Sequence, residues 1–147
     1  MLLVRIPISG VAKHWDLIKG SISEAFPPTC VPDEKGMLSV LQQILAGGMQ
    51  VWACLRNRYP VEAVALLTTY IATEPITGTK SLLLFSLYAW EPLQRQDYLD
   101  GFETMKKYAL SEGCTNISYY TANSLFSKLA QEVGFNTQFN FGVLHLT

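Results

Sequence analysis

Few residues in this sequence have the types and spacing that metal or nucleophilic chemistry needs. Three cysteines, Cys30, Cys54 and Cys114, show no C-x-x-C spacing, and the two histidines, His14 and His145, lie near opposite ends of the chain. A zinc site has too few ligands to build on, so we expect no metal centre. We interpret the cysteines as reduced thiols, which predicts an intracellular, cytoplasmic protein.

Charged side chains are sparse and evenly balanced. Eleven basic and twelve acidic residues give a net charge of −1, and they are scattered singly along the chain. Without a basic cluster we expect neither nucleic acid nor a membrane surface as a partner. Arg56 and Arg58, in a hairpin turn, could contact a small anion, but a solvated turn is the simpler interpretation.

The composition is apolar for a chain of this length. Hydrophobic residues make up 49% of the 147 residues, and charged residues only 16%, against about 25% in an average soluble protein. A chain of this size can bury a core as one domain, residues 1–147, without disulfides. The apolar excess predicts either a large core or a surface covered by a protein partner or a second copy. We find neither a signal peptide nor a run of apolar residues long enough for a membrane span.

The elements that would position functional residues lie between residues 80 and 135. Residues 81–90 carry no charge and are rich in aromatics, which predicts a central strand covered on both faces. A polar loop follows over residues 91–96, then an amphipathic helix from about Asp97 to Ser111. A strand at 116–121 and a helix at 123–132 complete a βαβα order, which predicts a parallel strand pair.

The remaining segments predict supporting elements. Before the central strand we expect a strand, two helices and two hairpin-linked strands, at residues 2–8, 11–26, 37–45, 49–55 and 61–73. After it, alternating polar and aromatic residues predict two closing strands, at 136–141 and 142–147.

This order of elements, with two short motifs, resembles the GNAT family of N-acetyltransferases across nearly the whole chain. Residues 108–114, YALSEGC, look like the end of the family's helix before its fifth strand. Asn123 with Leu129, Ala130, Gly134 and Phe135 looks like its N…L-Y-x-x-x-G-F ending. The resemblance implies an α/β (α+β) fold with a mixed, mostly antiparallel sheet. It predicts six to seven strands flanked by about four helices, with the parallel pair around the central strand.

The resemblance also implies an acetyl-CoA site, but the loop for its pyrophosphate departs from the family pattern. The family binds the pyrophosphate on bare amides at a helix start, in a Q/R-x-x-G-x-G/A motif. No glycine occurs here between Gly78 and Gly101. Asp97 looks like a helix N-cap that would compete with the anion. If a cofactor binds, the resemblance implies contacts from residues of the central strand, the loop and the second helix: Leu87, Tyr88, Ala89, Gln94, Arg95, Gln96 and Asn123.

The catalytic groups that the resemblance implies are also incomplete. Where many relatives carry a tyrosine that protonates the leaving thiolate, this chain has Ala130. Tyr119 and Tyr120 lie on the preceding strand, and we take Tyr120 as the candidate acid. For the base, Glu62, Glu74 and Glu91 are available, and we take Glu91.

Two hypotheses follow. The first is a GNAT-fold protein that has lost standard acetyl transfer, binds no cofactor and serves as an interaction or structural module, for example in a larger viral assembly. Its partner surface could be the former cofactor cleft, the aromatic segment 139–146 or an exposed sheet edge. The alternative is an active acyl-CoA-dependent N-acetyltransferase in which Arg95 clamps the phosphates.

Overall fold

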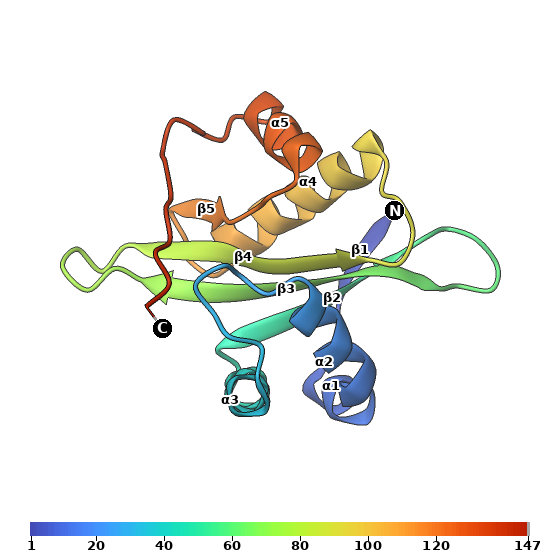
Figure 1. Ribbon diagram of the computed structural model, residues 1–147. Helices are drawn as coiled ribbons and strands as arrows, with labels where there is room; N and C mark the ends of the chain where they lie inside the picture. Colours follow the sequence, from blue (N-terminus) through green and yellow to red (C-terminus); the bar gives the residue numbers. More distant parts are fainter. Residues whose placement is uncertain (147) are drawn as a thin grey trace.

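The computed structural model describes residues 1–146, and these form a mixed five-stranded sheet with helices on both faces (Figure 1). The strands follow one another in chain order across the sheet, and only β4 and β5 pair in parallel. The strands are β1 Leu2–Arg5, β2 Met49–Leu55, β3 Ala63–Thr73, β4 Lys80–Ala89 and β5 Asn116–Tyr119. The helices are α1 Ile8–Lys13, α2 Trp15–Glu24, α3 Glu34–Leu45, α4 Arg95–Ser111 and α5 Ser124–Glu132.

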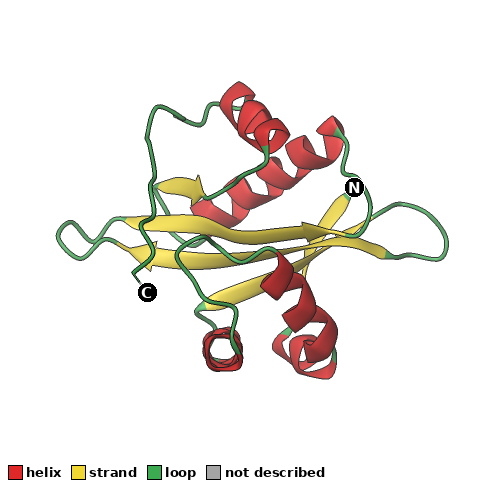
Figure 2. Cartoon of the chain, in the orientation of Figure 1, coloured by secondary structure: helices red, strands yellow, loops and turns green. Residues whose placement is uncertain are grey.

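The sheet separates two hydrophobic cores. Helices α4 and α5 cover one face, and α1, α2 and α3 cover the other (Figure 2). Alternate residues of β2 serve the two cores, because successive side chains of a strand point to opposite faces. Trp52 and Cys54 pack toward α4, whereas Met49 and Val51 pack toward α1–α3. The uninterrupted apolar runs of the central strands are therefore explained by burial on both faces.

Helix α4 begins two residues earlier than its apolar pattern predicts. Gln94 is the N-cap residue, in extended backbone conformation, and Arg95 is the first helical residue. Asp97 therefore occupies the third helical position, and the prediction that Asp97 is the N-cap is wrong. The helix ends as predicted, since Gly113 takes a φ of +74° just after it, a left-handed conformation that glycine adopts without strain.

The N-terminal helix and the chain end also differ from expectation. The single helix expected at 11–26 is two helices, because His14 leaves helical geometry with φ −111° and ψ 26°.

The sheet has five strands, fewer than the six to seven expected. Residues 136–146 form no strand, and their apolar side chains are mostly exposed, with Phe139 at 80% and Leu146 at 90%. An alternating pattern gives a segment the capacity to pair, but residues 136–146 form no ladder with any strand of the described chain. Thr147 of the second expected strand lies outside the described residues.

Candidate functional site

A β-bulge opens the sheet between β4 and β5. Thr68 of β3 pairs with Ser86, but the next residue, Thr69, pairs with Leu84, so Phe85 is an extra residue on β4. The parallel ladder with β5 stops at the same point, where Leu84 faces Tyr119. Because bulges bend a strand and end its pairing, residues 85–89 continue beside β3, and no strand within residues 1–146 pairs with their other side. We call this interruption of the ladder the β4–β5 opening.

The first turn of α4 lies after this opening and retains two unused amide donors. The Asp97 carboxylate accepts the Gln94 N–H at 2.8 Å, and the Gln94 carbonyl accepts the Asp97 and Tyr98 N–H groups at 3.0 and 3.3 Å. Within residues 1–146, the amides of Arg95 and Gln96 have no hydrogen-bond acceptor. Free amides at a helix start favour an anion.

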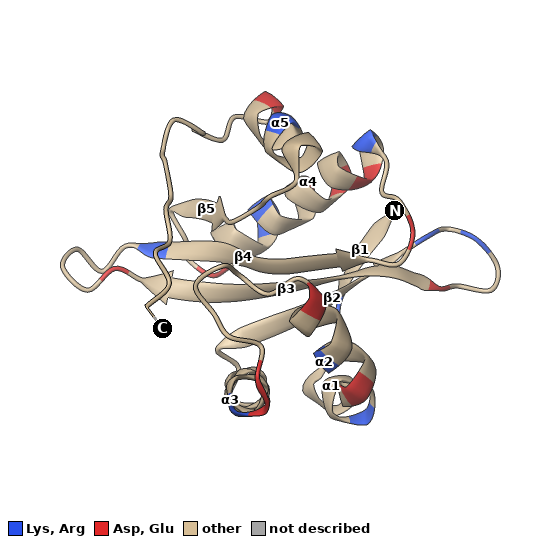
Figure 3. Ribbon diagram, in the orientation of Figure 1, with Lys and Arg blue, Asp and Glu red and all other residues tan. Residues whose placement is uncertain are grey.

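Asp97 does not present a free negative charge at this point. Its side chain is buried, with a residue exposure of 6%, and the Arg56 guanidinium lies 3.0 Å from its carboxylate oxygens. Arg56 also donates to Glu91 at 2.7 Å and to the Pro92 carbonyl at 3.1 Å. Figure 3 shows the basic part of the β2–β3 loop beside the acidic part of the β4–α4 connection, where Arg56 pairs with Glu91. Arg56 is thus not the solvated turn residue that we expected.

Arg95, which the sequence suggests as a phosphate clamp, directs its side chain toward α5. Arg95 is exposed and pairs with Glu132 at the end of α5. Gln96 donates its side-chain amide to Asp100 at 2.8 Å. Gln94 contributes the N-cap backbone. Of these three candidate residues, Arg95 and Gln96 therefore have backbone amides free to bind an anion, while their side chains are paired with Glu132 and Asp100.

The candidate residues of β4 lie along the opening. Leu87 packs toward α4, and Tyr88 makes an edge contact with Trp90 at 5.7 Å between ring centroids. Ala89 ends the strand and is exposed. An apolar cavity of about 40 Å³ lies next to Leu87, between β4 and the helices. Its walls include Leu84, Tyr98, Phe102 and Phe126.

Asn123 has a structural contact of its own. Its side-chain oxygen accepts the Phe126 N–H at 3.1 Å, which makes Asn123 the N-cap of α5. The side chain is exposed. Asn123 follows β5 by a few residues, on the far side of the opening from β4.

The two catalytic candidates are not brought together. Tyr120 directly follows β5, is 39% exposed, and its ring lies 4.7 Å from that of Phe141. Glu91 lies at the far end of β4, bound by Arg56 and by Arg58 at 3.1 Å. These hydrogen bonds, first from Arg56 and then from Arg58, hold the pKa of Glu91 below its usual range. The other phenol on the strand, Tyr119, packs on Phe126 and Phe135.

The site also contains residues that the sequence did not single out. Tyr98 borders the apolar cavity, and burial, followed by the nearby Asp97 charge, raises its pKa. Thr68 and Ser86 are buried opposite each other at the bulge, and the Thr68 hydroxyl has no partner within the described residues. Alternation from Leu66 places Thr68 on the α1–α3 face. No residue type near Phe85 marks the position of the bulge in the sequence, so these residues could not be identified beforehand.

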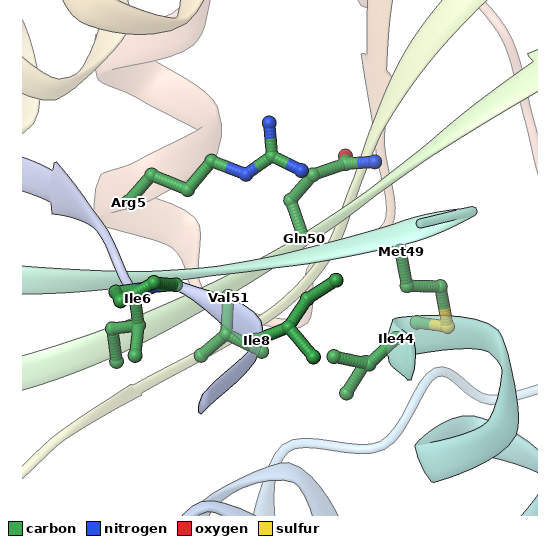
Figure 4. A pocket seen from close by; sticks show the side chains of 8 residues that line it. Arg5, Ile6, Ile8, Ile44, Met49, Gln50 and Val51 are labelled. Atoms are coloured by element: carbon green, nitrogen blue, oxygen red, sulfur yellow. The ribbon is translucent and has the colours of Figure 1, made fainter. Parts of the chain in front are cut away.

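A second cavity lies away from the opening. It has a volume of about 120 Å³ and lies where β1, α1, α3 and β2 meet. In Figure 4, Ile8, Ile44 and Met49 lie on one side of the β2 ribbon and the side chains of Arg5 and Gln50 on the other. Arg5 lies over the Tyr108 ring at 5.8 Å. This cavity has no free charged group directed into it from the described walls.

Two classes of site find no support in the described part of the chain. Residues 1–146 contain no cluster of three or more His, Cys, Asp or Glu side chains placed to hold a metal ion. None of the helices in that range has the length and apolar character needed to cross a bilayer.

Comparison with solved structures gives full-length likenesses at low sequence identity. No family model and no curated protein sequence matches the chain. A probable acetyltransferase superposes with a TM-score of 0.68 at 16% identity, covering 100% of this chain and 99% of the other. AAC(6')-Iy, in complex with CoA-S-monomethyl-acetylneamine, gives 0.69 at 12% identity, with coverage of 99% and 97%. A ribosomal-protein-alanine N-acetyltransferase from Brucella melitensis biovar Abortus 2308 gives 0.65 at 9% identity, with coverage of 99% and 100%. Together with the strand order and the parallel β4–β5 pair, these likenesses show that the chain has the GNAT fold.

Proposed function

We propose that this chain binds an acyl-CoA thioester in the β4–β5 opening and transfers the acyl group to an amine. The observation that carries the proposal is the combination of an interrupted β4–β5 ladder with two free amides at the start of α4. The full-length likeness to acetyltransferase structures supports the same choice.

The residues present fit such a ligand through their backbone. The free amides of Arg95 and Gln96 would take the pyrophosphate, a role that needs no particular side chain. The outward backbone groups of residues 85–89 would hydrogen-bond the amide-containing arm. The missing glycines restrict how closely a phosphate can approach, but all three side chains at positions 94–96 are exposed and can turn outward.

The chemistry divides between ligand and protein. The thioester supplies an activated acyl group and a thiolate leaving group. The protein's part is chiefly to hold the acceptor amine in line with the carbonyl, a contribution that can dominate the rate of acyl transfer.

For proton transfer we propose Tyr120 as the donor to the leaving thiolate, since it follows β5 at the edge of the opening and remains accessible. The proton that the amine nitrogen loses as the amide bond forms passes to water, and solvent restores the phenol. We do not propose Glu91 as the base, because two guanidinium groups stabilise its charged form. A base of low proton affinity contributes little at neutral pH. We assign Glu91 to the ionic contacts that position the β4–α4 connection.

The direct test is isothermal titration calorimetry with CoA, acetyl-CoA and a longer acyl-CoA. Binding of any of them, abolished by blocking the opening with Ala89→Trp, supports the proposal. A matched control is Leu110→Trp, which adds the same side chain at an exposed position on the far end of α4. Absence of binding by all three ligands would remove the proposed function.

A second candidate is the interaction module, and the exposed chain end favours it. Phe139, Phe141, Leu144 and Leu146 are all more than half exposed, and β5 pairs only with β4. An apolar segment beside an open strand edge is suited to contact with a protein partner or a second copy. Size-exclusion chromatography with light scattering measures self-association. A monomer at every concentration tested would leave a different protein as the only partner class.

A further inference from the structure

The side chain of Arg56 connects three consecutive parts of the candidate anion site. It follows β2 directly, and its guanidinium reaches Glu91 at the end of the central strand, Pro92 in the connection and Asp97 in the first turn of α4. The bonds measure 2.7 Å to Glu91, 3.1 Å to the Pro92 carbonyl and 3.0 Å to Asp97. A planar guanidinium with several donors is the side chain suited to such multiple contacts.

The contact with Asp97 changes the charge that an anion meets. The Asp97 carboxylate is buried and also holds the Gln94 amide. An uncompensated carboxylate at this point would repel a phosphate approaching the neighbouring amides of Arg95 and Gln96, and burial would strengthen the repulsion. With Arg56 in place, the pair has no net charge, and the partial positive charge of the helix start remains available.

We propose that Arg56 is a positioning residue for the pyrophosphate of the acyl-CoA: it neutralises Asp97 and ties the first turn of α4 to the β2–β3 loop. This inference rests on the proposed function, and it adds a requirement that the function alone does not impose. Arg56 acts through Asp97 and the connection, without touching the phosphate.

Arg58 supplies a matched control within the same loop. It binds Glu91 at 3.1 Å and Glu62 at 3.0 Å, but it does not reach Asp97. It is also more exposed than Arg56, with 44% of its side chain accessible against 23%. Removing either arginine subtracts one positive charge from the loop, so the two variants differ mainly in what happens to Asp97.

The experiment compares four variants by calorimetry with CoA: Arg56→Gln, Arg58→Gln, Asp97→Asn and the double variant Arg56→Gln/Asp97→Asn. We expect Arg56→Gln to weaken binding by about tenfold, which corresponds to about 1.4 kcal/mol. Arg58→Gln and Asp97→Asn should change it by less than about threefold, and the double variant should recover to within about threefold of the unmodified chain.

The double variant decides between an indirect and a direct role. If it binds as weakly as Arg56→Gln alone while remaining folded, neutralising Asp97 is not what Arg56 contributes to binding, and the proposal is wrong. Equal weakening by Arg56→Gln and Arg58→Gln would mean that only the net charge of the loop matters, which also overturns it.

Amide hydrogen exchange without ligand separates this inference from the proposed function. Arg56→Gln should speed the exchange of the Gln94, Asp97 and Tyr98 amides, whereas Arg58→Gln should not, because Arg56 bonds Asp97 in the first turn of α4 and Arg58 does not. If the unmodified chain binds no CoA, the proposed function fails, and the exchange result still shows whether Arg56 fixes this turn. Unchanged exchange in Arg56→Gln would contradict the positioning role.

Discussion

Leu84 of β4 faces Tyr119 of β5, and no residue beyond this pair continues the parallel ladder. The next residue of β4, Phe85, is the bulged one. Two strands that separate at a bulge leave the remainder of β4 with free backbone groups, a feature that costs hydrogen bonds unless a ligand or water uses them. The proposed acyl-CoA site depends on this separation.

The backbone and the side chain of Arg95 make different contributions, and two substitutions distinguish them. Arg95→Ala retains the free amide and removes only an exposed pair with Glu132, so we expect CoA affinity to change by less than about twofold. Arg95→Pro removes the amide at a helix position that tolerates proline, and the extended Gln94 before it suits a following proline. We expect several-fold weaker binding, measured by calorimetry. Equal effects of the two substitutions would show that the side chain, not the amide, is used.

The buried Thr68 hydroxyl predicts a substitution that stabilises the fold. Thr68 is 1% exposed and its hydroxyl is unsatisfied within the described residues. Replacing it with valine of the same shape should raise the free energy of unfolding by about 1 kcal/mol. Urea denaturation measures this change, and a destabilised Thr68→Val variant would show that the hydroxyl has a partner in the folded chain.

Cys54 predicts a loss of stability in alkali. Burial, followed by the charge of Asp97, raises the pKa of the Cys54 thiol to about 12, with Arg56 acting in the opposite direction. A free thiol titrates near about 8.5, so between these values the folded chain binds the proton that the unfolded chain has lost. The contribution of Cys54 to stability is therefore complete below about pH 8.5 and declines as the pH rises toward 12.

We expect Cys54→Ala to flatten this alkaline decline relative to the unmodified chain, although the substitution lowers stability at neutral pH by removing a core side chain. Urea denaturation at a series of pH values gives the slope for each protein. Parallel slopes would indicate that Cys54 ionises as freely in the folded state as in the unfolded one.

A substitution at Phe139, in the exposed segment after α5, should separate effects on folding from effects on association. Phe139 is 80% exposed and belongs to no strand, so Phe139→Asp should change the free energy of unfolding by less than about 0.5 kcal/mol. If this segment contacts a second copy, the same substitution should shift light-scattering mass toward the monomer. A large loss of stability at concentrations where the chain is monomeric would show that Phe139 is buried in solution.

The central strand and the elements after it were largely predictable because their burial determines their sequence. Leu82 and Leu84 are buried in the core beside α4, and Phe85 packs against the core on the opposite face, so the apolar run of β4 has one simple explanation. Gly113 also marked the end of α4, since a left-handed residue is needed there. The start of α4 was less predictable, because Gln94 caps it through its backbone geometry and Asp97 reads equally well as cap or third residue.

Contacts between distant residues could not be predicted. Arg56 and Asp97 are 41 positions apart, and their pairing depends on the β2–β3 loop reaching the start of α4. The sequence therefore suggested a solvated arginine and an aspartate opposed to anions, whereas the structure joins them. The bulge at Phe85 likewise depends on the register between β3 and β4, which no single residue type specifies.

An NMR titration that follows individual backbone amides tests the central claim most directly. On addition of CoA, we expect the largest chemical-shift changes at Arg95 and Gln96 and along residues 85–89, the groups left free by the structure. Residues of the β3–β4 turn and of α3, far from the opening, should remain unchanged. No response at the start of α4, or changes confined to residues 136–146, would contradict acyl-CoA binding in the β4–β5 opening.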